Sequence, residues 1–186
     1  YRYSLKNIYI NRESEEMRSV AEHFGINYYK RKIELASDST TNDEFALDFI
    51  ENVSCDYLHQ YLATSPLLKP ETIRSFHDTS FDSSTLISVV PHQIEAIYKD
   101  SGINFEKDKQ TPPSQDLKPV YTYACSMMSW KTKNFVDNMK SENNSAYHGG
   151  NKNTSYFEVK GIEAIDIDNE EDLELAQAAI EMVSKK

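Results

Sequence analysis

The residues best placed for chemistry are two carboxylates near the end of the chain, Asp166 and Asp168. They alternate with Ile165 and Ile167, and this pattern predicts a strand with both aspartates on one face. Two carboxylates at positions i and i+2 can hold one hard divalent cation between them. The alternative is an acidic helix start that binds nothing, because negative charge is favourable at a helix N-terminus.

The residues after this pair predict the final helix of the chain. Asn169 is a suitable N-cap, and Asp172 is expected to serve the start of the helix rather than a ligand. Apolar residues then recur at helical spacing and predict a buried face made of Leu173, Ala176, Ile180 and Val183.

The composition indicates a globular protein with a sizeable core: 186 residues, of which 39% are hydrophobic and 11% aromatic. The formal net charge of −10 argues against non-specific nucleic-acid binding and against an anionic membrane surface, but not against a metal-bound nucleotide. No apolar run is long enough to span a bilayer and no signal peptide is recognised, so we expect a cytoplasmic protein. Cys55 and Cys125 are therefore expected to be reduced, buried thiols.

Strand and helix patterns alternate along the chain and predict an α/β fold with a mostly parallel sheet. The expected strands cover residues 6–11, 26–30, 56–62, 85–90, 120–130 and 155–160, and helices are expected to start near Ser14, Thr41 or Asn42, and Pro70. Residues 91–119 break the rhythm and suggest an excursion or small lobe within one domain spanning residues 1–186. In such sheets ligands bind at the carboxyl ends of the strands, where residues 11–14, 31–38, 64–66 and 166–168 are expected to converge.

Taken in order, these segments resemble the acylneuraminate (CMP-sialic acid) cytidylyltransferase family, whose members activate acidic sugars. Residues 10–16 resemble its strand-to-helix turn, with Glu13 where Asp is usual, and residues 31–38 resemble the motif RPAELAxD. Residues 62–67 resemble QPTSPL, residues 114–121 resemble RRQDLPPVY, and residues 165–172 resemble IDIDTxED. The matches follow the family order over nearly the whole chain.

The resemblance implies a three-layer, Rossmann-like nucleotidyltransferase fold. It also implies an enzyme that moves CMP from CTP to a sialic acid-like or other nonulosonic or octulosonic acid and releases pyrophosphate. Mg²⁺ would be held by the catalytic pair Asp166 and Asp168, and residues 91–119 would build a homodimer. The implied nucleotide-binding residues are Arg31, Thr64, Ser65 and Glu13, and the implied sugar-binding residues are Gln115 and Tyr121.

Several of these positions have simpler explanations. Arg31 could be an exposed member of a basic run, Thr64 and Ser65 could be ordinary turn residues, and Tyr121 could belong to the core.

The sequence also departs from the family pattern. The family's glycine-rich basic loop has no counterpart before Lys6, Leu62 replaces a glutamine, and residues 124–126 (Ala-Cys-Ser) replace the common Asn-Gly-Ala. Three hypotheses follow. The first is an active Mg²⁺-dependent cytidylyltransferase whose N-terminal strand and glycine-rich loop are absent from this sequence. The second is a catalytically silent member that lacks this loop and binds a nucleotide or a partner chain, and the third is a nucleotidyltransferase for another base or sugar.

Overall fold

The structure is a computed structural model that describes residues 4–37, 39–150 and 153–184. Contacts within the chain divide it into two compact units, Tyr1–Ser54 (unit 1) and Cys55–Lys186 (unit 2). The expectation of one domain spanning residues 1–186 stays a prediction. None of the helices in the described ranges is long and apolar enough to cross a membrane.

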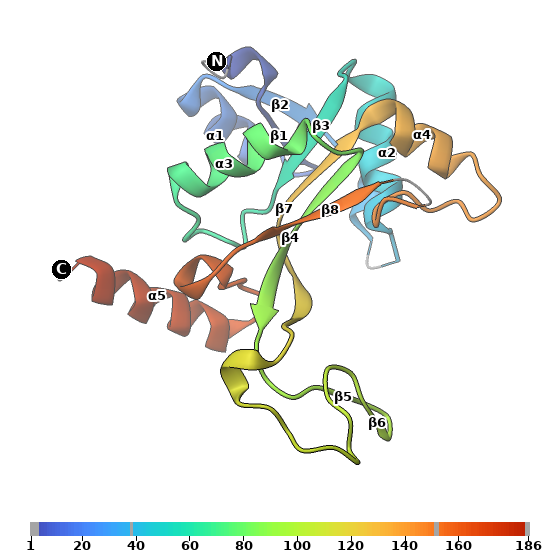
Figure 1. The fold of residues 1–186 in the computed structure, drawn as a ribbon. Coiled ribbons are helices and arrows are strands. Elements are labelled where there is room, and N and C mark those ends of the chain that lie inside the picture. The colour runs from blue at the N-terminus through green and yellow to red at the C-terminus, as the bar shows by residue number, and fades with distance from the viewer. Residues whose placement is uncertain (1–3, 38, 151–152, 185–186) are drawn as a thin grey trace. The chain divides into compact units, whose positions relative to one another are not determined.

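Unit 1 is built on a two-stranded parallel sheet, in which β1 (Tyr9–Arg12) pairs with β2 (Asn27–Lys30) (Figure 1). The strands are joined by α1 (Glu16–Phe24), which ends at Gly25 with φ 64°, a left-handed conformation that glycine adopts without a Cβ clash. Short 3₁₀ turns cover Leu5–Asn7 (η1) and Ile33–Ala36 (η2). Residues 6–8, expected in the first strand, therefore lie outside it, because η1 occupies the chain up to Asn7.

The second helix of unit 1, α2 (Asn42–Asn52), begins with a capping box. The Thr41 hydroxyl accepts from the Glu44 main-chain N–H at 3.2 Å, and the Glu44 carboxylate accepts from the Thr41 N–H at 2.7 Å. The helix buries Phe49, whose ring lies edge-on to Tyr9 and Tyr29 of the two strands at centroid distances of 5.3 and 5.0 Å. Of the two caps that the sequence allowed, Thr41 and Asn42, the helix uses Thr41. The aromatic contact of Phe49 attaches the helix to the sheet.

Unit 2 contains a four-stranded sheet in the order β3–β7–β4–β8. The strands are β3 (Tyr57–Tyr61), β4 (Thr85–His92), β7 (Val120–Lys131) and β8 (Thr154–Glu158). β7 runs antiparallel to both β3 and β4, whereas β4 and β8 are parallel. Three of the four strands therefore share one direction, as expected for a mostly parallel α/β sheet, and the antiparallel β7 was not predicted.

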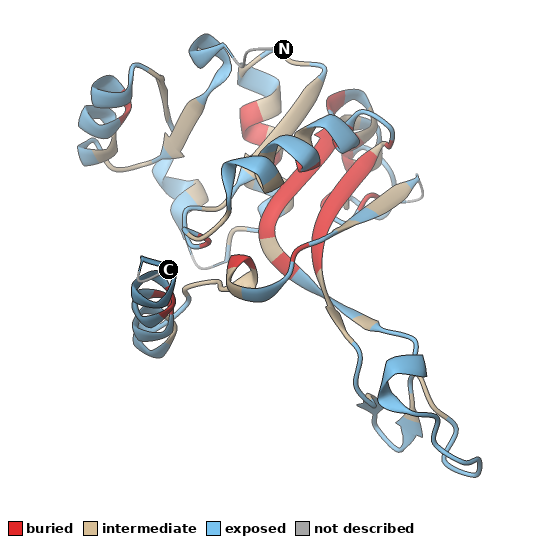
Figure 2. Cartoon of the chain, turned by 60° about the vertical axis from the view of Figure 1, so that its left-hand side comes forward, coloured by how far each residue is buried: buried red, intermediate tan, exposed pale blue. Residues whose placement is uncertain are grey.

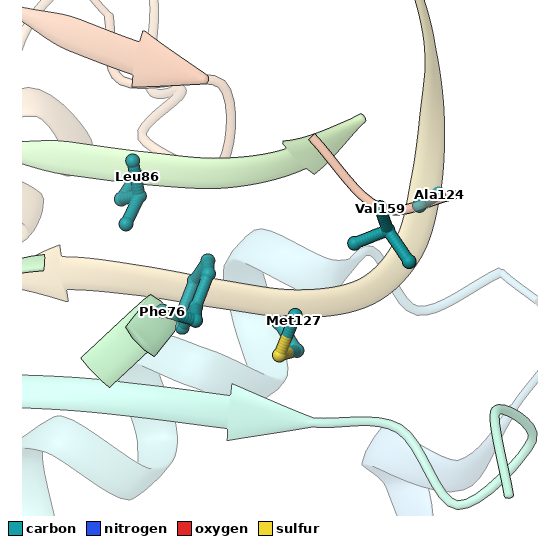
Figure 3. Packing of buried hydrophobic residues seen from close by; sticks show 5 residues of the cluster. All are labelled: Phe76, Leu86, Ala124, Met127 and Val159. Carbon is teal, nitrogen blue, oxygen red and sulfur yellow. The ribbon is translucent and has the colours of Figure 1, made fainter. Parts of the chain in front are cut away.

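Helices cover both faces of this sheet. On one face α3 (Pro70–Ser80) contributes Phe76 to a core cluster with Leu86, Ala124, Met127 and Val159 (Figure 3). On β7, Met127 and Trp130 are three residues apart and so point to opposite faces. Trp130 packs edge-on against Phe135 of α4 (Thr132–Met139) at 5.5 Å. The buried residues are concentrated in β4 and β7 (Figure 2), so the sheet has the layered arrangement that a helix on each face produces.

Residues 93–119 leave the sheet between β4 and β7 as an arm (Figure 1). The arm contains a small hairpin, β5 (Ile97–Tyr98) with β6 (Ser101–Gly102), and a 3₁₀ turn, η3 (Ser114–Asp116). The Asn104 amide nitrogen donates to the main-chain oxygens of Ile94 and Lys118, both at 2.8 Å. This one side chain therefore ties together the two ends of the arm.

The C-terminal segment differs from expectation in two ways. No strand forms at residues 165–168, because the chain turns there from a 3₁₀ helix, η4 (Gly161–Ala164), into α5 (Glu170–Ser184). The predicted buried face of α5 is confirmed only at Ala176: Leu173, Ile180 and Val183 are 44–49% exposed, and Ala179, which was not predicted, is buried. Periodicity identifies residues that share a helix face, whereas burial depends on which tertiary element covers that face.

Candidate functional site

The loop after β3 meets the predicted Asp166–Asp168 pair in unit 2. The Ile167 main-chain N–H donates to the Thr64 carbonyl oxygen at 2.9 Å. The hydroxyl of Ser65, a residue that is only 4% exposed, donates to the Asp166 carboxylate at 3.3 Å. Thr64 itself is exposed. The structure thus brings together two segments that the sequence had assigned to one site.

Asp168 is held at the start of α5. The Asp172 carboxylate accepts from the main-chain N–H groups of Asp168 and Asn169 at 3.1 and 3.2 Å. The Asn169 side chain accepts from the Asp172 N–H at 3.1 Å, so Asn169 is the predicted N-cap and Asp172 completes a reciprocal cap. Asp172 therefore serves the helix, as expected, and the exposed Asp168 carboxylate is left at the surface beside it.

A β-bulge in β7 lies next to this edge. The register with β4 shifts between Ile87 and Val89, where the chain of β7 has extra residues. The fully buried Ser88 hydroxyl accepts from the Met127 N–H at 2.9 Å and lies 3.0 Å from the Ser126 hydroxyl. The Leu62 N–H donates to the Ser126 carbonyl at 3.0 Å. The bulge is consequently fixed to both neighbouring strands by hydrogen bonds rather than left loose.

Cys125 sits in this bulge with φ 52°, in the left-handed region that favours glycine. Burial raises the pKa of its thiol, and the negative charges of Asp166 and Asp168 raise it further. Both cysteines are free thiols and only half-buried, so their expected full burial is wrong. Sequence analysis assigned Cys125 no role at the carboxylate pair, since no spacing signal links these positions.

Glu163 is a buried carboxylate that sequence analysis also missed. It accepts from the Lys69 main-chain N–H at 3.0 Å and pairs with the Lys69 ammonium at 3.1 Å. Burial opposes its ionisation, but hydrogen bonds from Thr72 and Lys69 outweigh burial and lower its pKa. This contact fixes η4, and hence the turn into Asp166, to the first turn of α3.

The oxygen atoms of the Asp166 and Asp168 carboxylates are ligands of the kind that Mg²⁺ binds. Among the residues that the structure describes, no three His, Cys, Asp or Glu side chains are grouped as a metal site. Mg²⁺ commonly takes only one or two carboxylates and completes its shell with water and substrate phosphates. Asp166 and Asp168 are hard oxygen donors, and both charges act on the same thiol. The magnesium site stays a prediction.

The two predicted sugar-binding residues lie on the arm side of unit 2. Tyr121 is 47% exposed, so it is not a core residue, and its hydroxyl donates to the Glu158 carboxylate at 3.0 Å. Gln115 is exposed on η3, and its main-chain carbonyl accepts from the Gln93 side chain at 2.6 Å. Their role in sugar binding stays a prediction.

In unit 1, Arg31 and Glu13 form an ion pair at 2.5 Å just beyond the carboxyl ends of β2 and β1. The Arg31 side chain is only 12% exposed, and its guanidinium lies 5.6 Å from the centre of the Phe45 ring. The hydrogen bond from Arg31 lowers the pKa of Glu13. Arg31 is therefore not an exposed member of a basic run.

Two polar atoms of unit 1 are buried without a partner among the described residues, Arg31 Nε and Asn11 Oδ1. Asn11 pairs with Tyr29 in the β1–β2 register, and Arg31 follows just beyond the end of β2. A polar ligand can satisfy a buried donor and a buried acceptor of this kind. Contact of Arg31 or Glu13 with a nucleotide stays a prediction.

No protein-family model matches this sequence, and no curated protein sequence matches it significantly. Solved structures do match in fold. 4-Diphosphocytidyl-2C-methyl-D-erythritol synthase from Anaerococcus prevotii superposes with TM-score 0.62 at 13% identity, over 91% of this chain and 78% of that one. CMP:2-keto-3-deoxy-manno-octonic acid synthetase complexed with CTP gives TM-score 0.58 at 11% identity, over 94% and 80%.

The bifunctional IspDF from Campylobacter jejuni gives TM-score 0.59 at 12% identity, over 91% of this chain and 41% of that one. At these identities the likeness establishes the architecture and no more. The chain has the α/β fold of the Rossmann-like nucleotidyltransferases.

Proposed function

We propose that this protein is a cytidylyltransferase that moves CMP from CTP to an acidic sugar. The observation that carries the proposal is the meeting of Ser65, Cys125 and the Asp166–Asp168 pair at the carboxyl end of β3. Ligands bind at this end of the strands in open α/β sheets. The same fold in proteins whose names describe a cytidylyl product or a bound CTP supports CTP as the nucleotide.

In the proposed reaction a sugar hydroxyl oxygen attacks the α-phosphorus of CTP. A new P–O bond to the sugar forms, the bond to the pyrophosphate oxygen breaks, and the hydroxyl proton leaves to solvent or a base. Such transfers depend mainly on positioning and on neutralising charge. Asp166 and Asp168 would hold Mg²⁺, which supplies that neutralisation at the phosphates when bound.

The remaining assignments follow from the chain's own geometry. Ser65 orients the Asp166 carboxylate through its hydroxyl, and the exposed Thr64 is free to face the nucleotide. Arg31 and Glu13 stay proposed nucleotide contacts, and their ion pair in unit 1 leaves the Arg31 Nε–H without a partner among the described residues. The sugar is assigned to the surface around Tyr121 and Gln115, and an acid of the sialic or octulosonic type is the proposed class.

The test is calorimetric titration of CTP, with and without Mg²⁺, into the wild-type chain and into the double variant Asp166→Asn/Asp168→Asn. The matched control is Glu170→Gln/Glu171→Gln, which removes the same charge from the exposed first turn of α5. We expect Mg²⁺-dependent binding that prefers CTP over other triphosphates, is lost in the aspartate variant and is kept in the control. Equal loss in both variants would contradict a specific carboxylate site. A folded wild-type chain that binds no CTP would instead mean that the family's glycine-rich loop is essential for binding, or that this member has left catalysis.

A further inference from the structure

Two histidines from different elements of unit 2 lie against each other. His59 is on β3 and His77 is on α3. Their ring centroids are 4.7 Å apart, with the ring planes tilted by 43°. Neither histidine belongs to the predicted nucleotide, metal or sugar residues, and the proposed function does not use them.

Other aromatic rings surround this histidine pair. Phe81 lies edge-on to His59 and His77, at centroid distances of 5.7 and 4.9 Å, and Tyr57 stacks on His59 at 6.2 Å. Phenylalanine side chains would make the same ring contacts, so packing alone does not explain why two imidazoles stand here. What imidazole adds is a ring nitrogen, the commonest side-chain ligand of metal ions.

The ring nitrogen His59 Nδ1 is buried and has no hydrogen-bond partner among the described residues. Ser129 is opposite His59 in the β3–β7 register, and its buried hydroxyl lacks a partner within the same ranges. Directly opposite residues of an antiparallel pair have their Cβ atoms about 4.5–5.5 Å apart on one face of the sheet. Neighbouring buried polar atoms without partners are rare, and a bound ion with its water supplies a partner to both.

A carboxylate stands beside the second ring. The Nδ1 atom of His77 lies 3.5 Å from a carboxylate oxygen of Asp78. A carboxylate at this nitrogen holds a proton on Nδ1 and leaves Nε2 as the ligand atom, which is the usual arrangement of metal-binding histidines. The negative charge of Asp78 would also offset part of the charge of a divalent ion.

The protonation of His59 and the exposure of His77 suit metal binding. Burial, and then the neighbouring His77, lower the pKa of His59 from 6.5 to about 4, so this imidazole is neutral at neutral pH, as a metal ligand must be. The side chain of His77 is 19% exposed and that of Asp78 is 81% exposed, so solvent reaches the edge of the pair. The formal net charge of −10 favours the approach of cations.

The ligand atoms select the kind of ion. Imidazole nitrogen suits Zn²⁺, Cu²⁺ and Ni²⁺, whereas Mg²⁺ prefers oxygen ligands. Two imidazole nitrogens that bind one ion at about 2.0–2.1 Å bring their ring centroids to roughly 5 Å from each other. The observed separation of 4.7 Å agrees with this value. Because no three His, Cys, Asp or Glu side chains are grouped among the described residues, water would complete the shell of the ion.

We infer that His59 and His77 form a binding site for Zn²⁺ or a similar first-row transition-metal ion, which links α3 to β3. The inference is independent of the proposed function, since the magnesium predicted at the carboxylate pair is a hard ion with oxygen ligands. β3 and α3 flank the loop at residues 62–69, which carries Thr64 and Ser65. A bound ion would therefore hold both ends of that loop.

The test is calorimetric titration of Zn²⁺ and Ni²⁺ into the full chain, with Mg²⁺ present in excess to occupy oxygen ligands. The variants are His59→Phe and His77→Phe, which keep a ring beside Phe81. His23→Phe is the matched control, because it removes an imidazole from the exposed surface of α1. Nitrogen NMR of the imidazole rings in the wild-type chain identifies the atoms that bind the ion.

We expect one Zn²⁺ per chain, with the NMR signals of the His59 and His77 ring nitrogens shifted in the bound state. Each of the variants His59→Phe and His77→Phe should weaken Zn²⁺ binding by about tenfold or more. His23→Phe and Asp166→Asn/Asp168→Asn should leave it unchanged. Zn²⁺ should also raise the melting temperature of the wild type and not that of His59→Phe, because an ion that binds only the folded state stabilises it.

A wild-type chain that binds neither Zn²⁺ nor Ni²⁺ would overturn the inference. Binding without a shift of the His59 and His77 nitrogens would overturn it too, and this measurement decides even where His59→Phe does not fold. Equal loss of affinity in His23→Phe, or displacement of Zn²⁺ by Mg²⁺, would assign the binding to other groups. Failure of CTP binding alone would count against the proposed function and leave the histidine site standing.

Discussion

The Ser65 hydroxyl donates to the Asp166 carboxylate at 3.3 Å, although the two residues are 101 positions apart in the sequence. Ser65 is buried and lies in a turn, where its main-chain N–H donates to the Leu62 carbonyl at 3.2 Å. The hydroxyl is therefore directed at the carboxylate by the backbone of the loop. This contact joins the loop after β3 to the turn before α5 and defines the candidate site.

Replacement of Ser65 by alanine should weaken the site and the fold together. Loss of a hydrogen bond to a charged group should lower the free energy of unfolding by about 1–2 kcal/mol. Mg²⁺-dependent CTP affinity should fall several-fold, because Asp166 loses its orienting donor. Urea unfolding and calorimetry measure the two effects. Ser19→Ala, on the exposed surface of α1, is the control, and a Ser65 variant that behaves like it would contradict this role.

Cys125 offers a test of backbone strain. Its φ of 52° costs an ordinary residue about 1–3 kcal/mol, and glycine avoids most of this cost. We expect Cys125→Gly to keep or raise the free energy of unfolding, whereas Cys125→Val should lower it by about 2 kcal/mol or more. Cys55→Gly is the control, since Cys55 is not among the described residues with positive φ. Equal destabilisation by the two glycine variants would refute the strain.

His59 should make unit 2 sensitive to acid. Burial, and then the neighbouring His77, lower the pKa of His59 from 6.5 to about 4, and its Nδ1 is buried without a partner among the described residues. The unfolded chain therefore binds the proton more readily, so stability falls as the pH drops from 6.5 to about 4. The loss at the lower end should reach up to about 3 kcal/mol.

This pH dependence is checked by urea unfolding across that pH window. His59→Phe keeps an aromatic ring beside Phe81, whose centroid lies 5.7 Å from that of His59, and removes the titrating group. We expect this variant to show a flatter profile than the wild type. His23→Gln, at an exposed position on α1, should leave the profile unchanged. An unaltered slope in His59→Phe would assign the acid sensitivity to other groups.

Glu163 should be a stabilising residue in its ionised form. Glu163→Ala leaves the Lys69 N–H without its acceptor and should cost about 2–4 kcal/mol. Because the folded-state pKa of Glu163 is lowered, its contribution is complete above the ordinary value of 4.5 and is lost as the pH falls below it. Thermal unfolding of Glu163→Ala against Glu174→Ala, on the exposed side of α5, measures the difference. Similar melting temperatures for the two variants would exclude an anchoring role.

The arm should be where a second copy of the chain docks. Four large apolar residues of the arm are 56–66% exposed: Ile94, Ile97, Tyr98 and Ile103. Several large exposed apolar residues on one short segment are a feature of protein interfaces. We expect a concentration-dependent dimer by light scattering, and Ile97→Ser/Tyr98→Ser should shift it to monomer. Leu175→Ser/Met182→Ser, on the exposed surface of α5, is the control. A monomeric wild type at all concentrations would refute the dimer.

Local structure was predictable from the sequence wherever it depends on a few neighbouring residues. The Thr41 capping box, the left-handed Gly25, Pro70 at the start of α3 and the Asn169 cap were all readable, because each depends on a few adjacent residues. The convergence of the loop at residues 64–65 with residues 166–168 was also predicted, although residues 166–168 reach it in the turn before α5 and not at the end of a strand. The α/β class of the fold followed from the same alternation of periods.

Long-range pairing and burial were decided by the tertiary structure alone. The antiparallel direction of β7, the absence of a strand at residues 165–168 and the exposure of Ile180 depend on which neighbours each segment meets. The same holds for Cys125, whose position in a bulge beside two carboxylates leaves no trace in its sequence neighbourhood. The amino-acid sequence thus determined the elements, their caps and the residue types available for chemistry. Only packing between distant segments decided which of those residues meet, because contact free energies depend on neighbours that local sequence does not specify.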